Sequence, residues 1–502
     1  MRLDFHSSFA RSRKSIHWPL LLSLFLLALL TSSALFIPKV NAFASGQNAS
    51  VVIGQPSFNT NYRGGHASQS NLSSPWDVAF DSSGNLWVAD SSNSRVLEFK
   101  APFSNGESAA IVIGESSFTI SGFIGGPPNG TVIFSPQGLA FDSSGNLWVS
   151  DSGDNRIVEF KAPFSNGQNA SLVLGAPDLK TEENPGLQGT QTTLNAPAGI
   201  TFDSSGNLWT ADESNYRVLE FKAPFSSGEA ASVVLGQDNF TAKTFPNEPN
   251  CPPACNTPTK ATLNDPSDVA FDSAGNLWVA DRSDSRVVEF SPPFSNGQSA
   301  SVVLGGECAI FGVVLAANCF DVTDGIAIDH SGTLWVSDSS NGRILGFPAP
   351  ISNGENATVV LGEPDFVTGL SSGILNATQS NLANPEGIAL DSSGNLWVAD
   401  DGLNRVLEFS ASIVSSTTTV SPTTPSSTTT SSGSTVVSIP QSSSASSSQS
   451  SSQSSQSSPS GAVPEFPLQV AGVAMVVVVT LASYLLLRRR PGDRIGSLPG
   501  PA

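Results

Sequence analysis

The sequence is poor in the residues that most hydrolases use for catalysis. Histidine occurs four times in 502 residues, and only His66 and His330 lie beyond residue 44. The chain contains no HExxH motif and no glycine-rich phosphate loop, and no serine–histidine–aspartate arrangement can be read from it. These absences argue against zinc proteases, P-loop enzymes and triad hydrolases.

Basic residues are also scarce, with 23 Lys and Arg against 42 Asp and Glu. Nine of the basic residues and three of the acidic ones lie near the two ends of the chain, which leaves 14 basic against 39 acidic residues, a net charge of −25. Such a surface repels phosphate backbones. The composition therefore excludes a nucleic-acid partner and favours cations or basic partners.

Cysteine is limited to four residues, all in irregular segments: Cys251, Cys255, Cys308 and Cys319. They include no C-x-x-C pair and have no nearby histidine, so zinc binding is the weaker interpretation. An even number outside the cell predicts two disulfides. Local pairs, 251 with 255 and 308 with 319, are the simplest pairing, and cross-pairing between the two segments stays open.

What the sequence has in abundance is one repeated motif. FDSSGNLWVAD begins at Phe80 and returns with few changes at Phe141, Phe202, Phe271, Ile328 and Leu390. The first aspartates of these copies are 61, 61, 69, 57 and 62 residues apart. A fixed period of this kind indicates a repeat architecture.

Each repeat predicts four strands. The motif gives two strands around a tight turn in which Gly84 takes positive φ, residues 95–99 alternate as a third strand, and residues 111–113 form a fourth. Six hairpins and six fourth-strand motifs occur, but the chain opens with the fourth-strand motif at residues 51–53. We therefore expect an all-β fold over residues 45–410, a six-bladed β-propeller closed by pairing of residues 51–53 with residues 405–409.

The repeat also resembles a known family. The pattern from Pro75 to Phe99, P-x-[DG]-[VLI]-A-F-D-S-S-G-N-L-W-V-A-D-x-x-x-x-R-V-x-E-F, is similar to the NHL repeat, although Trp stands where that family often has Tyr and Thr323 replaces Pro in the fifth copy. The resemblance implies a propeller. It implies little about activity, because NHL-like propellers include RNA binders, a lyase and receptor ectodomains.

The two ends of the chain predict export and membrane attachment. Residues 1–44 read as a secretory signal peptide with an A-x-A site ending at Ala44, an uncleaved anchor being the alternative. Residues 411–465 form a Ser/Thr/Pro/Gln-rich stalk that is expected to stay disordered, and residues 466–487 a transmembrane helix. Arg488, Arg489 and Arg490 place the tail 488–502 in the cytoplasm.

Two further features concern the cell surface. Pro464-Glu465-Phe466 before the apolar run resembles the PEF-type sorting signal of archaeal surface proteins, and a plain anchor is the alternative. Seven sequons offer glycosylation sites at Asn48, Asn71, Asn129, Asn169, Asn239, Asn356 and Asn376. We expect a single-pass cell-membrane protein with a monomeric, extracellular propeller.

The expected topology separates a uniform face from a variable one. The DSSGN and APFSNG loops repeat on one face, whereas the long connections between blades differ in length and sequence and lie on the other. The aspartate and arginine five residues apart in every repeat, such as Asp90 and Arg95, are expected to be structural ion pairs. The repeated tryptophans are expected to pack between blades.

Four acids at the start of the innermost strands depart from the repeat: Asp77, Asp268, Asp324 and Glu386. Carboxylates around a pore suggest Ca²⁺ as a possible cofactor, and solvated or strand-capping acids are the plainer interpretation. Trp76 and Gln137 at the same level are candidate ligand contacts. The sequence thus favours a recognition or adhesion module that binds protein or glycan through the variable face, with a calcium-dependent lactonase, hydrolase or lyase as the alternative.

Overall fold

The computed structural model describes residues 40–62, 67–120, 128–181, 189–242, 258–305, 315–369 and 376–414. The chain divides into two compact units, residues 1–419 and 420–502, and every described residue belongs to the first. The predicted signal-peptide core, most of the stalk, the predicted transmembrane helix and the tail lie outside the described residues. No helix within the described ranges is long and apolar enough to cross a membrane.

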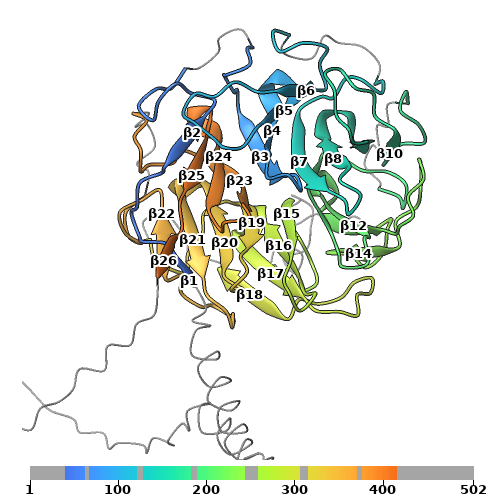
Figure 1. The fold of residues 1–502 in the computed structure, drawn as a ribbon. Helices are drawn as coiled ribbons and strands as arrows, with labels where there is room; N and C mark the ends of the chain where they lie inside the picture. Colours follow the sequence, from blue (N-terminus) through green and yellow to red (C-terminus); the bar gives the residue numbers. More distant parts are fainter. Residues whose placement is uncertain are drawn as a thin grey trace, which may run out of the picture. The chain divides into compact units, whose positions relative to one another are not determined.

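Six four-stranded antiparallel sheets are arranged around a central axis, as predicted (Figure 1). The first three blades consist of β3 (Pro75–Phe80), β4 (Leu86–Asp90), β5 (Arg95–Phe99) and β6 (Ile111–Ile113); β7 (Pro136–Phe141), β8 (Leu147–Asp151), β9 (Arg156–Phe160) and β10 (Leu172–Leu174); and β11 (Pro197–Phe202), β12 (Leu208–Asp212), β13 (Arg217–Phe221) and β14 (Val233–Leu235).

The other three blades consist of β15 (Pro266–Phe271), β16 (Leu277–Asp281), β17 (Arg286–Phe290) and β18 (Val302–Gly305); β19 (Thr323–Ile328), β20 (Leu334–Asp338), β21 (Arg343–Phe347) and β22 (Val359–Leu361); and β23 (Pro385–Leu390), β24 (Leu396–Asp400), β25 (Arg405–Phe409) and β2 (Val51–Ile53). β2 pairs antiparallel with β25, so the leading strand completes the sixth blade. The innermost strands contact one another in sequence, and β23 contacts β3 to close the ring.

The repeated motif is explained by one hydrogen-bonded turn. Asp81 Oδ1 accepts from the backbone N–H groups of Ser83 and Asn85, at 2.8 and 2.9 Å, and its Oδ2 accepts from the indole Nε1 of Trp87 at 3.3 Å. Gly84 has φ +80°, which an L side chain rarely adopts. The motif therefore repeats because the turn requires the aspartate, the glycine and the tryptophan together.

A buried ion pair joins the second and third strands of each blade. In the first blade, Arg95 Nε lies 2.7 Å from Asp90 Oδ2, and both side chains are fully buried. The guanidinium also donates to the carbonyls of Phe118, Ser68 and Asn71, which belong to the two neighbouring connections between blades. The predicted structural role of these pairs is confirmed, because within the described residues every such arginine binds a carbonyl at the root of a variable connection, and all but Arg286 bind carbonyls of two connections.

Aromatic rings fill the seams between blades. Trp87 of the first blade packs edge-to-face against Phe141 and Phe164 of the second, with ring centroids 5.8 and 4.7 Å apart. In the fifth blade, Trp335 packs in the same way against Phe43, at 4.8 Å. Phe43 thus takes the place that loop phenylalanines take in other seams.

The N-terminal boundary of the fold differs from the sequence prediction. β1 (Val40–Ala42) pairs with β26 (Ser412–Val414), and the Gly46 N–H donates to the Val360 carbonyl at 3.0 Å. Residues 40–44, which include Phe43 and were assigned to the signal peptide, are therefore part of the described fold. The prediction missed this because the A-x-A site was taken as the end of the signal peptide, although FASGQNASVVIG at residues 43–54 closely repeats FSNGQNASLVLG at residues 164–175.

The contribution of Phe43 can be measured by truncating its side chain. Phe43→Ala removes half-buried aromatic surface from the seam at Trp335, and we expect a loss of about 2 to 3 kcal/mol in the free energy of unfolding. Phe103→Ala, at the equivalent place beside Trp397, serves as the matched variant, and the exposed Val367→Ala as the control. Urea unfolding checks the result, and unchanged stability in Phe43→Ala would place the start of the fold after Ala44.

Candidate functional site

The start of each innermost strand brings one short side chain or none to the central channel. The third residue of each innermost strand lies at the β-bulge. Around the ring these residues are Asp77, Gly138, Gly199, Asp268, Gly325 and Gly387. A Cβ atom on Gly387 would lie 2.2 Å from Asp77 Oδ1, and one on Gly199 would lie 2.1 Å from Asp268 Oδ1. Glycine is therefore required in the blade preceding each aspartate.

Asp77 and Asp268 both join one blade to the next. Asp77 accepts from the backbone N–H of Val78 at 2.8 Å and from that of Leu139 in the next blade at 2.9 Å. Asp268 accepts in the same way from Val269 and Ile326, both at 2.8 Å. Each carboxylate thus uses both oxygens on backbone groups, which explains why they interrupt the repeat.

Burial of these carboxylates changes their protonation. Burial is the largest effect and raises the pKa of Asp77 to about 7. The pKa of Asp268 is raised well above its ordinary value by burial and then by the charge of Asp77. Burial therefore favours the protonated form of both carboxyl groups, and Asp77 is about half protonated near pH 7.

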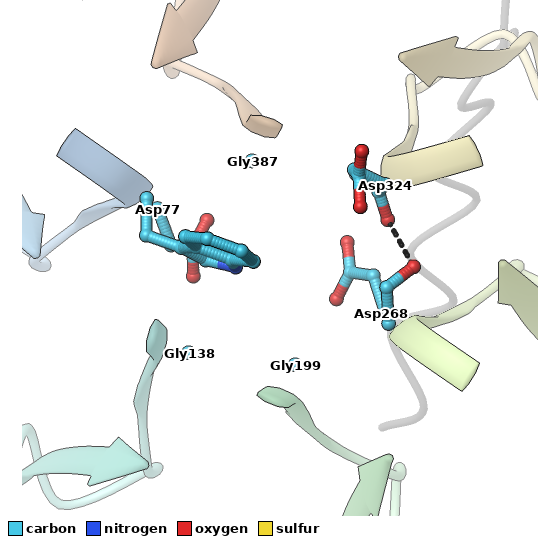
Figure 2. Close-up of a pocket in the computed structure, with 9 residues that line it drawn as sticks. Asp77, Gly138, Gly199, Asp268, Asp324 and Gly387 are labelled. Carbon is cyan, nitrogen blue, oxygen red and sulfur yellow. Dashed lines mark hydrogen bonds between the residues drawn. The ribbon is translucent and has the colours of Figure 1, made fainter. Parts of the chain in front are cut away.

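A cavity of about 10 Å³ lies between these groups, lined by Trp76, Asp77, Gly138, Gly199, Ser267, Asp268, Asp324, Gly325 and Gly387. Figure 2 shows Asp77 on one side of this cavity and Asp268 and Asp324 on the other. Ser267 Oγ donates to the Asp324 carbonyl at 2.9 Å. The space matches a single water molecule, so a larger ligand must bind above it, at the mouth of the channel.

An arginine organises the mouth. Arg282 begins η5 (Arg282–Asp284), and its Nε lies 2.9 Å from Asp324 Oδ1 while its NH1 lies 3.3 Å from Glu213 Oε1. Its guanidinium carbon lies 5.7 Å from the ring centroid of Trp76. The arginine remains 27 % exposed, so this group of side chains is reachable from solvent.

The carboxylates at the mouth exceed the positive charge available to them. Burial raises the pKa of Glu213 to about 7, although Arg282 opposes the shift. Burial and the neighbouring charge of Asp324 raise the pKa of Glu386 well above its ordinary value. Glu386 Oε1 accepts from Asn384 Nδ2 at 2.8 Å, whereas Glu386 Oε2 is buried without a hydrogen-bond partner.

The sequence analysis missed Arg282 and Glu213. Both occupy the position directly after the LWVAD motif, where the 3-10 turns η1 (Ser91–Asn93), η2 (Ser152–Asp154), η3 (Glu213–Asn215), η5, η6 (Ser339–Asn341) and η7 (Asp401–Leu403) begin. This position reads Ser, Ser, Glu, Arg, Ser and Asp around the ring, between positions that hardly vary. The variation of this position from blade to blade was the sequence signal that pointed to Arg282 and Glu213.

The four predicted calcium ligands are placed at the channel but divide into two pairs. Asp77 and Asp268 bind backbone N–H groups, and Asp324 is paired with Arg282 beside Glu386. Within the described ranges, no group of three or more His, Cys, Asp or Glu residues is placed to hold a metal ion. Calcium binding here stays a prediction that the donor geometry does not favour.

The remaining predicted contacts fall on both described and undescribed residues. Trp76 and Gln137 are half-buried beside the channel, and Gln137 Oε1 is buried without a hydrogen-bond partner. The middle parts of the variable connections lie outside the described residues, with Cys251, Cys255 and Cys308; Cys319 is buried. The disulfide pairing stays a prediction.

The predicted glycosylation sites are all described. Asn48, Asn129, Asn169, Asn239, Asn356 and Asn376 are exposed. Asn71 is half-buried, and its Oδ1 accepts from the Ser68 N–H at 2.7 Å. Glycosylation of these asparagines stays a prediction, and Asn71 is the least accessible of the seven.

Family models match separate parts of the chain. The NHL repeat model matches residues 72–99 and 135–160, and the SMP-30/Gluconolactonase/LRE-like region model matches residues 248–433. The chain therefore carries NHL repeats within its six-bladed propeller.

Curated relatives are distant and share only a part of their length with this chain. Teneurin-1 of Mus musculus is 22% identical over 305 residues, which cover 54% of this chain and 10% of the relative. Peptidyl-glycine alpha-amidating monooxygenase B of Xenopus laevis is 26% identical over 326 residues, covering 55% and 34%. NHL repeat-containing protein 3 of Homo sapiens is 34% identical over 84 residues, covering 16% and 23%.

Solved structures resemble the chain at low identity. A streptogramin B lyase is 14% identical with a TM-score of 0.38, covering 68% of this chain and 94% of its own. A protein of unknown function from Bacteroides thetaiotaomicron is 10% identical with a TM-score of 0.38, covering 74% and 75%.

The raised pKa of Asp77 predicts a pH dependence of stability. Because the pKa of Asp77 is higher in the folded chain, the folded state binds more protons, and stability falls as pH rises from about 4 to about 7. In Asp77→Asn we expect this fall to be shallower, by up to about 1.4 kcal/mol per pH unit.

Urea unfolding at several pH values, followed by tryptophan fluorescence, measures this slope. Asp178→Asn is the control, because this exposed aspartate has a lowered rather than a raised pKa. Equal slopes in the wild type and in Asp77→Asn would contradict the raised pKa of Asp77.

Proposed function

We propose that this chain is a membrane-anchored recognition module that binds an extracellular protein or glycan ligand through the face carrying the variable connections. The observation that carries the proposal is the mouth of the channel on that face. There, Trp76, Glu213, Arg282, Asp324 and Glu386 break a repeat that is otherwise nearly identical from blade to blade. Residues that vary on a repeated scaffold commonly carry specificity.

The framework around the mouth supports binding without large rearrangement. Buried arginines such as Arg95 hold carbonyl groups at the roots of two neighbouring connections. The connections therefore start from fixed points, and their sequences can differ without disturbing the blades. A rigid scaffold with variable connections lowers the entropy lost when a ligand binds.

The charge of the mouth favours a ligand that presents a positively charged group. Arg282 is surrounded by the carboxyl groups of Asp324, Glu386, Glu213 and Asp265, which raise its pKa against the effect of burial. Because the pKa of Glu213 is about 7, the negative charge of the mouth grows as pH rises through neutrality, and the mouth then favours a cationic group.

The cellular setting of the proposal comes from the sequence. A signal peptide, a 411–465 stalk and a 466–487 span would display a monomeric propeller at the cell surface, and glycans on exposed asparagines suit the same setting. The proposal excludes nucleic acid as a ligand because of the net charge.

Substitutions at the mouth test this proposal. We expect Trp76→Ala and Arg282→Lys each to weaken ligand binding at least 10-fold, because they change the aromatic and bidentate parts of the mouth. Lys161→Ala is the matched control, since this exposed lysine follows β9 on the opposite face.

Binding is measured with full-length protein in detergent, against arrays of glycans and of extracellular protein fragments. Thermal unfolding confirms that each variant folds. Equal binding by all three variants and the wild type would overturn the assignment of the binding face.

A second candidate function, a metal-dependent lactonase, hydrolase or lyase, is favoured by one observation. The carboxyl groups of Asp324 and Glu386 are both buried beside Arg282, with Asp324 Oδ1 2.9 Å from Arg282 Nε and Glu386 Oε2 without a hydrogen-bond partner. Buried acids with raised pKa are frequent at catalytic sites. In this function the pair would supply an acid and a base at the mouth of the channel.

This candidate predicts bound calcium and turnover that both depend on Asp324. If it holds, elemental analysis finds about one calcium ion per chain, and Asp324→Asn lowers turnover of lactone or polysaccharide substrates at least 100-fold. Asp178→Asn, at an exposed position, is the control. Protein that contains no metal and turns over no substrate would rule it out.

A further inference from the structure

One seam between blades lacks the aromatic rings that fill the others. In four seams a tryptophan packs edge-to-face on a loop phenylalanine of the next blade, as Trp87, Trp148, Trp209 and Trp397 do at centroid distances of 4.7 or 4.8 Å, and Trp335 packs on Phe43 at 4.8 Å. Beside Trp278, between the fourth and fifth blades, both equivalent positions are aliphatic. They are Ile328 on β19 and Ile351 in the loop between β21 and β22.

A cavity of about 230 Å³ lies at this seam. Trp278 and Glu289 line it from the fourth blade, and Ile328, Pro350 and Ile351 line it from the fifth. An apolar cavity of about 150 Å³ is large enough to bind benzene. The space at the seam therefore accepts a six-membered aromatic ring with a substituent.

The polar wall of this cavity lacks the partners that the equivalent residues have in the first three blades. In the second blade, Asn146 Nδ2 donates to Glu159 Oε1 at 3.1 Å, and Asn146 Oδ1 accepts from the Ala162 N–H at 3.3 Å. Lys161 Nζ also lies 3.9 Å from Glu159 Oε2. The first and third blades have the same asparagine bond and lysine pair.

The fourth blade has neither interaction. Ser291 stands in place of the lysine, and Pro292, in place of the alanine, has no N–H to donate. Asn276 donates to Asp272, and Glu289 accepts from Ser301 Oγ at Oε2. Glu289 Oε1 and Asn276 Oδ1 thus keep acceptor capacity next to the cavity.

We propose that this seam binds an aromatic ring that carries a hydroxyl donor, supplied as a tyrosine side chain of a protein partner. The ring would take the place beside Trp278 that a phenylalanine takes in the other seams, and the phenol would donate to Glu289. The site lies on the face of the repeated turns, opposite the mouth of the channel, so it goes beyond the proposed function and does not depend on it.

The chemistry of the seam selects this ligand over other rings. Edge-to-face contact with an indole requires an aromatic partner, which a sugar ring does not provide. Glu289 Oε2 already accepts from Ser301, so its Oε1 can accept a hydrogen bond from a ligand hydroxyl. Phenylalanine would fill the volume but leave Glu289 without the bond.

Full-length protein in detergent is titrated with N-acetyl-tyrosinamide, N-acetyl-phenylalaninamide and methyl glucoside, with binding followed by ligand-observed NMR. We expect the tyrosine probe to bind at least 5-fold tighter than the phenylalanine probe. Ile351→Phe introduces the phenylalanine that the equivalent loops carry in other seams. It should weaken binding of the tyrosine probe at least 10-fold and raise the unfolding temperature of the protein. Ile328→Phe is the second filling variant if Ile351→Phe does not fold.

Two further variants separate volume from polarity. Glu289→Gln should reduce the preference for tyrosine over phenylalanine. The double change Phe141→Ile and Phe164→Ile opens the seam at Trp87, where Asn85 and Lys100 still engage Glu98, so it should bind both aromatic probes without preference.

Tyrosine binding that both filling variants leave unchanged would overturn the proposal. Preferential binding of methyl glucoside, or no binding of any probe to the wild type, would overturn it as well.

Discussion

The buried ion pair between the aspartate that ends the second strand and the arginine that begins the third is the interaction on which the rest of the molecule depends. Its Nε to Oδ2 distance is 2.6 or 2.7 Å in all six blades. Removing one partner of such a pair leaves a buried charge, which typically costs 3 to 5 kcal/mol. Because the remaining guanidinium nitrogens bind carbonyls of the connections between blades, the pair couples the sheet, the 3-10 turn and the variable face.

Six blades with a common motif provide an internal comparison, in which positions that vary from blade to blade stand out. On the variable face the departures are Trp76, Glu213, Arg282, Asp324 and Glu386, which meet at the mouth of the channel. On the face of the repeated turns they are Ile328, Ile351 and Pro292, which leave a cavity between the fourth and fifth blades. The sequence analysis predicted this second face to be uniform, and at that seam it is not.

The carboxylates of the channel illustrate how burial decides between structural and chemical roles. Asp77 and Asp268 use all their oxygens on backbone N–H groups and join adjacent blades. Asp324 is ion-paired with Arg282, and Glu386 lies beside this pair with its Oε2 lacking a hydrogen-bond partner. Four acids that look alike in the sequence therefore divide into two that hold the ring together and two that are available for binding.

The sequence by itself determined the six blades, their strands, the closure by residues 51–53 and the structural role of Asp90 and Arg95, because these follow from local hydrogen bonding and from a period visible in one dimension. Only the tertiary structure decided that Phe43 belongs to the fold, that Arg282 meets Asp324 and Glu213, and that the seam at Trp278 is open. Those contacts join residues of different blades. Their geometry depends on how the sheets pack around the axis, which no local pattern encodes.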